Sequence, residues 1–202
     1  MAVASPSPSK QAGQVFALFG LEPSFEIDQA DLEDRLRQAS MAWHPDRFAL
    51  QGETAQLEAE DKMAAFNDAF PQLRDAPKRA ELLLRWLGAA PTQGTDSQAG
   101  PEFLMRMMEL REEAEEARDA ASSDPERLSK FLAGVRAHEQ ALLARFGQGF
   151  DALPDSLRCC EAVQDETAPM PEALNELRRV FYELRYYQRT REQLQEALSV
   201  DR

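Results

Sequence analysis

The chain has 202 residues, which allows one or two domains and a hydrophobic core. Its formal net charge of −13 argues against a nucleic-acid surface and an anionic membrane surface, because both require clustered lysines and arginines. Only 9 residues are glycine, 43% are hydrophobic and no apolar run approaches the ~20 residues of a membrane span, so the composition favours a helical protein without a transmembrane segment.

The two cysteines, Cys159 and Cys160, are adjacent in the sequence. Adjacent cysteines form no disulfide framework and fit a reducing compartment, so we expect a cytoplasmic protein. The stretch from Met1 to about Lys10 is rich in serine and proline and has no arginine and no apolar core. We therefore expect a disordered tail over residues 1–13 and no targeting peptide.

The first two predicted helices precede a polar corner. A short helix is expected over residues 14–19, and Asp28 is the expected N-cap of a second helix that runs to Trp43. Apolar residues at spacings of four, three and four predict its buried face: Leu32, Leu36, Ala39 and Trp43. Arg35 and Arg37 lie off this stripe and are expected to face solvent.

Two more helices follow the corner. A third helix is expected over residues 53–73, where Pro71 should kink or fray it, with an inner face of Met63, Phe66, Phe70 and Leu73. The sequence Asp75-Ala76-Pro77 predicts the start of a fourth, short helix that ends at Gly88. Its apolar side is formed by Ala80, Leu83, Leu84 and Leu87.

Residues 89–100 are rich in Pro, Gly, Thr, Ser and Gln and predict a linker. Three long helical runs follow, over 102–121, from Asp124-Pro125 to just before Gly147, and from about Pro171, whereas the pattern between Gly147 and Pro171 is poor. The seam of the third run is Ala173, Leu177, Val180, Leu184, Tyr187 and Leu194. We predict an all-α fold made of a tail (1–13), a helical-hairpin domain (14–88), a linker (89–100) and a three-helix bundle (101–202).

The corner itself is Trp43-His44-Pro45-Asp46-Arg47-Phe48. Pro45 stops the incoming helix, and Asp46 can stiffen the turn by bonding nearby backbone N–H groups. His44 and Asp46 could then be exposed contact residues, a base with its orienting carboxylate in a small hydrolase, or simply part of a capped turn. No nucleophile or phosphate loop accompanies them, and no His or Cys spacing fits a metal site, so we expect neither an enzyme nor a cofactor.

The first bundle helix combines a buried seam with an unusual opposite face. The seam is Phe103, Met107, Leu110, Ala114, Ala117 and Ala121, and the opposite arc holds Leu104, Met105, Met108, Glu109, Glu112 and Glu116. An apolar turn beside a line of glutamates predicts a docking surface for a basic partner. Phe181, Tyr182 and Tyr186 lie off the seam of the third helix and suggest further anchors. Alternatively, these side chains cover the linker or the N-terminal domain.

The sequence resembles a known family. A helix ending at His44-Pro45-Asp46 and a partner helix with Asn67-Asp68-Ala69-Phe70 look like a J-domain. The runs at 76–84 and 103–113, read as APKRAELLL and FLMRMMELREE, are similar to those of HscB, the J-protein co-chaperone of iron–sulfur cluster biogenesis. The similarity covers about residues 15–146 and 184–197.

The resemblance implies two binding sites and no catalysis. The corner and the basic side of the preceding helix would engage a DnaK-like ATPase, usually HscA, and stimulate it; the residues are His44, Pro45, Asp46, Arg35, Arg37 and Arg47. The bundle would hold the cluster scaffold protein IscU; the residues are Leu104, Met105, Met108, Glu109, Arg111, Glu112, Glu116 and Tyr186. The absence of an N-terminal cysteine pair favours a bacterial protein. The other possibilities are a J-protein for a different client and a hydrolase using His44 and Asp46.

Overall fold

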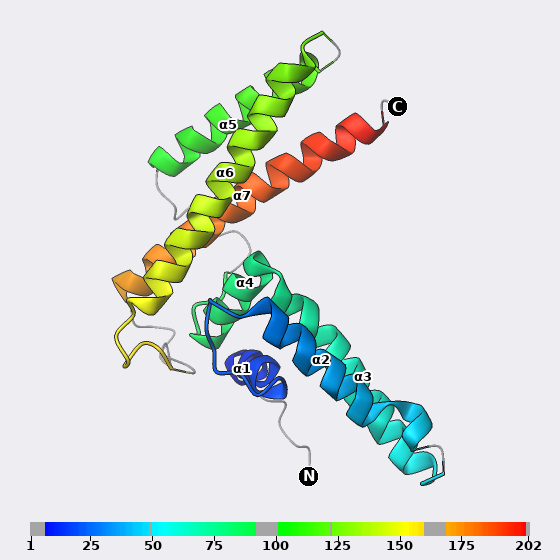
Figure 1. The fold of residues 1–202 in the computed structure, drawn as a ribbon. Coiled ribbons are helices and arrows are strands. Elements are labelled where there is room, and N and C mark those ends of the chain that lie inside the picture. The colour runs from blue at the N-terminus through cyan, green and yellow to red at the C-terminus, as the bar shows by residue number, and fades with distance from the viewer. Residues whose placement is uncertain (1–6, 49, 92–100, 122, 160–168, 201–202) are drawn as a thin grey trace. The chain divides into compact units, whose positions relative to one another are not determined.

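The computed structural model describes residues 7–48, 50–91, 101–121, 123–159 and 169–200. All regular structure in these residues is helical and none is strand, which confirms the all-α prediction (Figure 1). The chain divides into two compact units, Met1–Ala90 with Pro154–Ala168 and Pro91–Leu153 with Pro169–Arg202. No described helix has both the length and the apolar character needed to cross a membrane.

The N-terminal unit is a helical hairpin supported at one end. Helices α2 (Gln29–Trp43) and α3 (Glu53–Arg74) lie side by side and are joined through a short 3₁₀ helix, η1 (Pro45–Arg47). Helices α1 (Pro8–Leu18) and α4 (Ala76–Trp86) pack together at the end of the hairpin remote from η1 (Figure 1). Their shared core includes Phe16, Leu32, Leu73, Leu83 and Leu84, each 0% exposed.

Two features of this unit differ from the sequence prediction. Helix α1 begins at Pro8 and not at Gln14, so the predicted tail is wrong for residues 8–13; residues 1–6 lie outside the description. Ser7 caps this helix, with Pro8 in its first turn. Helix α3 does not fray at Pro71 but continues to Arg74, where the side chain of Leu73 is buried and the Asp75 N–H donates to the Pro71 carbonyl at 3.3 Å.

The second unit is a three-helix bundle of α5 (Pro101–Asp119), α6 (Pro125–Asp151) and α7 (Glu172–Val200). Helix α5 lies along the N-terminal half of α6 (Figure 1). The C-terminal half of α6 packs on α7, where a Cβ added at Gly149 would lie 2.9 Å from Leu177 Cδ2. The absence of a side chain at Gly149 therefore allows the close approach of these two helices.

Three expectations about the bundle are wrong. Helix α6 does not stop before Gly147 but continues to Asp151, because Phe146 and Phe150 extend its buried face. Ala173 is exposed, and its neighbour Leu174 is buried in its place. Phe181 is 1% exposed and belongs to the core, because α7 contacts both α5 and α6 and buries a wide arc. Residues 92–100 of the predicted linker lie outside the description.

Candidate functional site

Aromatic residues on both sides of the corner after α2 pack against each other. His44 leaves the helix with φ −63° and ψ 127°, and η1 starts at Pro45. The rings of Trp43 and Phe48 stack with centroids 5.9 Å apart and planes 8° apart. Lys62 Nζ of α3 lies 5.9 Å from the centroid of the Trp43 ring. Aromatic stacking at its base thus holds a short polar loop in a defined conformation.

The side chains of His44 and Asp46 point into solvent at this corner. The backbone N–H of Asp46 donates to His44 Nδ1 at 3.3 Å, and Asp46 Oδ2 lies 3.7 Å from the same nitrogen. The two side chains are 60% and 91% exposed. A base and a carboxylate this exposed act in bulk water and gain none of the low-dielectric strengthening on which hydrolases rely. The geometry suits contact with another protein.

The three arginines predicted to surround the corner differ in environment. Arg35 is half-buried, with Nη1 donating to the Phe19 carbonyl at 2.8 Å and Nε paired with Asp31 Oδ2 at 2.7 Å, so the expectation that it faces solvent is wrong. Arg47 Nη1 donates to the Met41 carbonyl at 2.6 Å. Arg37 is 66% exposed, and its ion-pair partner among the described residues is Asp34 of its own helix.

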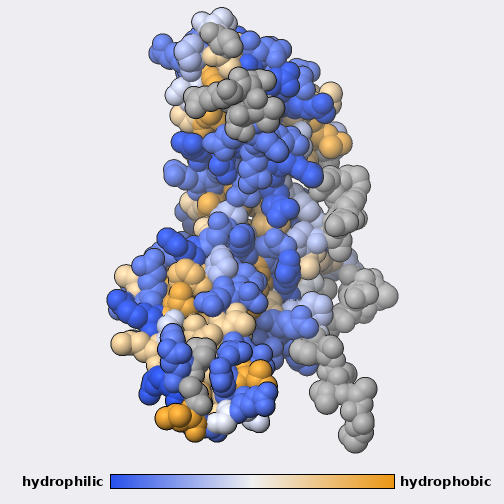
Figure 2. All heavy atoms as spheres, turned by 90° about the vertical axis from the view of Figure 1, so that its right-hand side faces the viewer, coloured by the Kyte–Doolittle hydropathy of each residue, from blue (hydrophilic) through white to orange (hydrophobic). Residues whose placement is uncertain are grey.

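Helix α5 presents the apolar turn expected from its sequence. Leu104, Met105 and Met108 are 48%, 63% and 64% exposed. Met107 and Leu110 on the opposite face are buried, which agrees with the predicted seam. Most of the molecular face in Figure 2 is hydrophilic, and hydrophobic side chains appear there as small separate patches. Three adjacent apolar side chains on one helix therefore form a candidate contact surface, which we call the α5 patch.

The charged residues around the α5 patch fall into two groups. Within the described residues, Glu109 and Glu112 form no ion pair and are exposed. Glu116 pairs with Arg127 of α6, and Arg111 Nε pairs with Glu115 Oε1 at 3.0 Å. Glu109 and Glu112 are thus the carboxylates available to a basic partner without breaking an existing pair.

The aromatic residues of α7 are arranged differently from the prediction. Tyr186 is half-buried on the helix against which α5 packs, and it remains a candidate contact. Tyr182 is also half-buried, with the guanidinium carbon of Arg178 lying 5.9 Å from its ring centroid. Of the three aromatics predicted as anchors, only these two reach the surface.

Sequence reasoning missed a polar cluster inside the bundle. Glu183 of α7 is 7% exposed, and its Oε1 accepts a hydrogen bond from Arg106 Nη1 of α5 at 2.7 Å. The same oxygen lies 3.2 Å from His138 Nε2 of α6, and the His138 ring stacks on Tyr187 with centroids 4.2 Å apart. The hydrogen bond to Glu183 raises the pKa of Arg106, and burial raises the pKa of Tyr187. The sequence signal available for this cluster was Glu183, an acidic residue beside the apolar stripe of α7.

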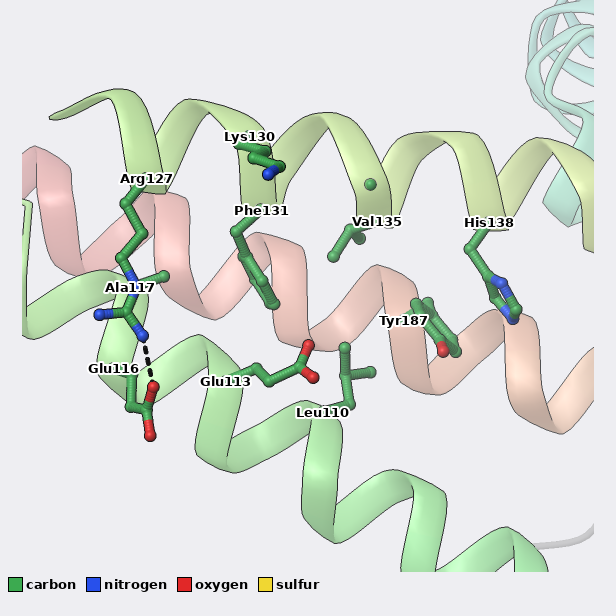
Figure 3. A pocket seen from close by; sticks show the side chains of 11 residues that line it. Leu110, Glu113, Glu116, Ala117, Arg127, Lys130, Phe131, Val135, His138 and Tyr187 are labelled. Atoms are coloured by element: carbon green, nitrogen blue, oxygen red, sulfur yellow. Dashed lines mark hydrogen bonds and ion pairs between the residues drawn. The ribbon is translucent and has the colours of Figure 1, made fainter. Parts of the chain in front are cut away.

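A cavity of about 650 Å³ adjoins this cluster between α5, α6 and α7 (Figure 3). Leu110, Glu113 and Ala117 of α5 face Phe131 and His138 of α6 across it. No group of three His, Cys, Asp or Glu residues in the described parts of the chain could hold a metal ion.

Three comparisons relate this geometry to known proteins. The sequence profile described as "HSCB C-terminal oligomerisation domain" matches residues 99–195. The co-chaperone protein HscB homolog of Neisseria meningitidis is 35% identical over 137 residues, which are 68% of this chain and 81% of the relative. Chaperone HscB from Vibrio cholerae is 29% identical, with a TM-score of 0.66, over 92% of this chain and 97% of its own.

The human co-chaperone HscB has a TM-score of 0.70 at 21% identity, over 90% of this chain and 80% of its own, which shows a shared fold. The exposed His-Pro-Asp corner, the bundle with its α5 patch and an alignment at 35% identity along most of both chains lead to one conclusion. The chain belongs to the HscB family, the J-domain co-chaperones of iron–sulfur cluster assembly.

Proposed function

We propose that this chain binds the scaffold protein IscU through its bundle, delivers it to the DnaK-like chaperone HscA and stimulates the ATPase of that chaperone. The chaperone contact consists of His44, Pro45, Asp46, Arg37 and Arg47. The client contact consists of the α5 patch with Glu109, Glu112 and Tyr186. The chain performs no catalysis itself, and both partners and the cytoplasmic location stay predictions.

The observation that carries this proposal is the exposure of the α5 patch. Three apolar side chains that are about half or more exposed cost solvation free energy unless a partner covers them. Methionine is flexible and suits a surface that adapts to another protein. The neighbouring carboxylates of Glu109 and Glu112 would favour a basic partner and disfavour an acidic one.

Direct binding tests the client assignment. Purified chain is titrated with IscU and, separately, with an unrelated client of another J-protein, and HscA ATPase is then measured with the chain alone. We expect saturable binding to IscU only, together with faster ATP hydrolysis by HscA. Binding to the unrelated client but not to IscU would instead support a J-protein with a different client. Hydrolytic activity of the chain itself, lost in His44→Gln, would support the hydrolase alternative.

A further inference from the structure

We propose that Glu183 is a positioning residue that fixes the rotation of α5 about its own axis and so determines which side chains of α5 face the client. This inference rests on the proposed client site. It concerns a carboxylate that is buried and cannot contact the client itself.

The geometry joins three helices at one carboxylate. Glu183 projects from α7, binds Arg106 of α5 at 2.7 Å and lies 3.2 Å from His138 of α6. Its side chain is 9% exposed, whereas those of Arg106 and His138 are 52% and 40% exposed. Because a desolvated carboxylate is costly without its partners, any rotation of α5 that removes Arg106 from Glu183 is penalised.

The apolar packing of α5 does not define that rotation well. Its buried seam consists of Met107, Leu110, Ala114 and Ala117. Alanine offers little shape to resist rotation, and methionine adapts to several arrangements. The cavity of about 650 Å³ next to Leu110 and Ala117 leaves further room for movement. A single buried polar contact is a known means of selecting one register among apolar alternatives.

The position of Arg106 couples this contact to the α5 patch. At ~100° per residue, Arg106 lies ~200° around the helix from Leu104, so a cation held at Glu183 directs Leu104 away from the bundle. Met108 lies only ~40° from Leu104 and is directed outward with it. Losing the contact would allow α5 to turn the patch partly toward the bundle.

The chain offers a matched control in the pair between Arg191 and Glu139. Arg191 Nε of α7 lies 2.9 Å from Glu139 Oε1 of α6, and the Glu139 side chain is 12% exposed. This pair has the same chemistry and a similarly buried carboxylate, but it joins α6 to α7 without α5. Its loss should affect bundle stability without changing the client surface.

The test compares Glu183→Met with Glu139→Met. Methionine replaces each carboxylate with an apolar side chain of similar length, and each substitution leaves an arginine without its carboxylate partner, which costs stability in both variants. We expect both variants to melt below wild type, and by similar amounts. Only Glu183→Met should weaken IscU binding, by roughly tenfold. Only this variant should also exchange the backbone amides of α5 faster in hydrogen–deuterium exchange.

A charge reversal separates positioning from direct contact. Arg106→Glu alone should weaken IscU binding, and Arg106→Glu combined with Glu183→Lys should restore it, because the pair is rebuilt with opposite polarity. Failure of the double variant to restore affinity would show that Arg106 contacts the client itself. Wild-type IscU affinity and wild-type α5 amide exchange in Glu183→Met would overturn the inference. Equal losses of IscU affinity in both methionine variants would overturn it as well. If wild type binds no IscU, the proposed client fails and the α5 exchange alone decides the role of Glu183.

Discussion

Arg35 and Arg37 are two positions apart on α2, yet their environments assign them different roles. The guanidinium of Arg35 binds the carbonyl of Phe19 at the end of α1, where Gly20 has φ +64° and its carbonyl is a second, weaker acceptor at 3.4 Å. Arg35 therefore supplies a donor to the Phe19 carbonyl, while the backbone N–H groups of Gly20 and Leu21 bond the carbonyls of Ala17 and Phe16. Arg37 is exposed and remains available to attract an acidic surface on the chaperone.

Reversing the charge of Arg37 tests this division. Arg37→Glu should weaken stimulation of HscA more at low salt than at high salt, because exposed charges are screened. Arg35→Ala should instead lower the free energy of unfolding by about 1–3 kcal/mol through lost charged hydrogen bonds. ATPase assays at two salt concentrations and denaturant unfolding provide the measurements. Equal loss of stimulation at both salt concentrations would mean that Arg37 does not act through charge.

His44 should matter for the chaperone and not for the fold. Its side chain is 60% exposed, so replacing it removes little packing energy. His44→Gln should abolish stimulation of HscA while its circular dichroism and melting temperature stay near wild type. IscU binding should survive, because that surface lies in the other unit. A large loss of helicity would show that His44 is part of the structure of the turn.

Arg79 is the buried cation that sequence patterns could not reveal. It is 5% exposed on α4, its Nε donates to the Phe25 carbonyl at 2.6 Å, and its Nη1 donates to the Leu73 carbonyl. Burial lowers the pKa of Arg79 from its usual value. Periodicity places an arginine between apolar positions on the surface, and only the fold brings the carbonyls of a loop and of α3 to one side chain.

Removing Arg79 should therefore destabilise the N-terminal unit. Arg79→Met leaves two buried carbonyls without a donor and should cost about 2–5 kcal/mol in denaturant unfolding. Arg79→Lys should recover little of this loss, because one ammonium lacks the fork that reaches both acceptors. An unfolding midpoint equal to that of wild type in either variant would contradict this assignment.

At the scale of helices, sequence periodicity predicted the buried faces better than the helix ends. Leu32 and Ala39 of α2 and Met107 and Leu110 of α5 are buried as their spacing indicated. The start of α1 was missed because its buried residues, Ser9 and Ala12, are small and show no apolar stripe. Ser7 with Pro8 was a usable capping signal that the surrounding Ser-Pro repetition obscured.

The ends and faces that failed depend on tertiary contacts. Glycine normally weakens a helix, yet Gly147 is buried and Gly149 lies against Leu177, so packing on α7 outweighs propensity. Phe181 was misplaced because a helix that packs on two neighbours buries more than one stripe. The exposed α5 patch was predictable because the apolar residues of α5 recur at spacings of three and four, which indicates the buried side of the helix.

The α5 patch and the α5 seam should respond differently to truncation. Changing Leu104, Met108 and Tyr186 together to alanine should weaken IscU binding at least roughly tenfold, because interface energy is concentrated in apolar and aromatic anchors. The melting temperature of this triple variant should change little. Leu110→Ala, in the seam, should instead destabilise the bundle by about 2–5 kcal/mol. Titration with IscU and thermal unfolding separate the two effects; a triple variant that melts like Leu110→Ala would place the patch in the core.

At the scale of the whole molecule, the sequence suggested a separate binding site in each of the two units. It did not indicate the polar contacts that join the helices within a unit. The corner at His44 and the α5 patch were both predicted from local sequence and are both exposed. The contacts of the Glu183 carboxylate were not predicted, because its two partners, Arg106 and His138, come from two other helices. The roles of the two units, chaperone contact and client contact, stay predictions.

HscA ATPase activity, measured with and without IscU for wild type, His44→Gln and the triple alanine variant, tests the central claim most directly. We expect IscU to increase the stimulation of HscA by wild type. The triple variant should stimulate HscA like wild type when IscU is absent and should show no such increase when IscU is added. His44→Gln should give no stimulation under either condition and still bind IscU in a parallel titration. Loss of IscU-independent stimulation in the triple variant, or loss of IscU binding in His44→Gln, would contradict the assignment of the two functions to two separate units.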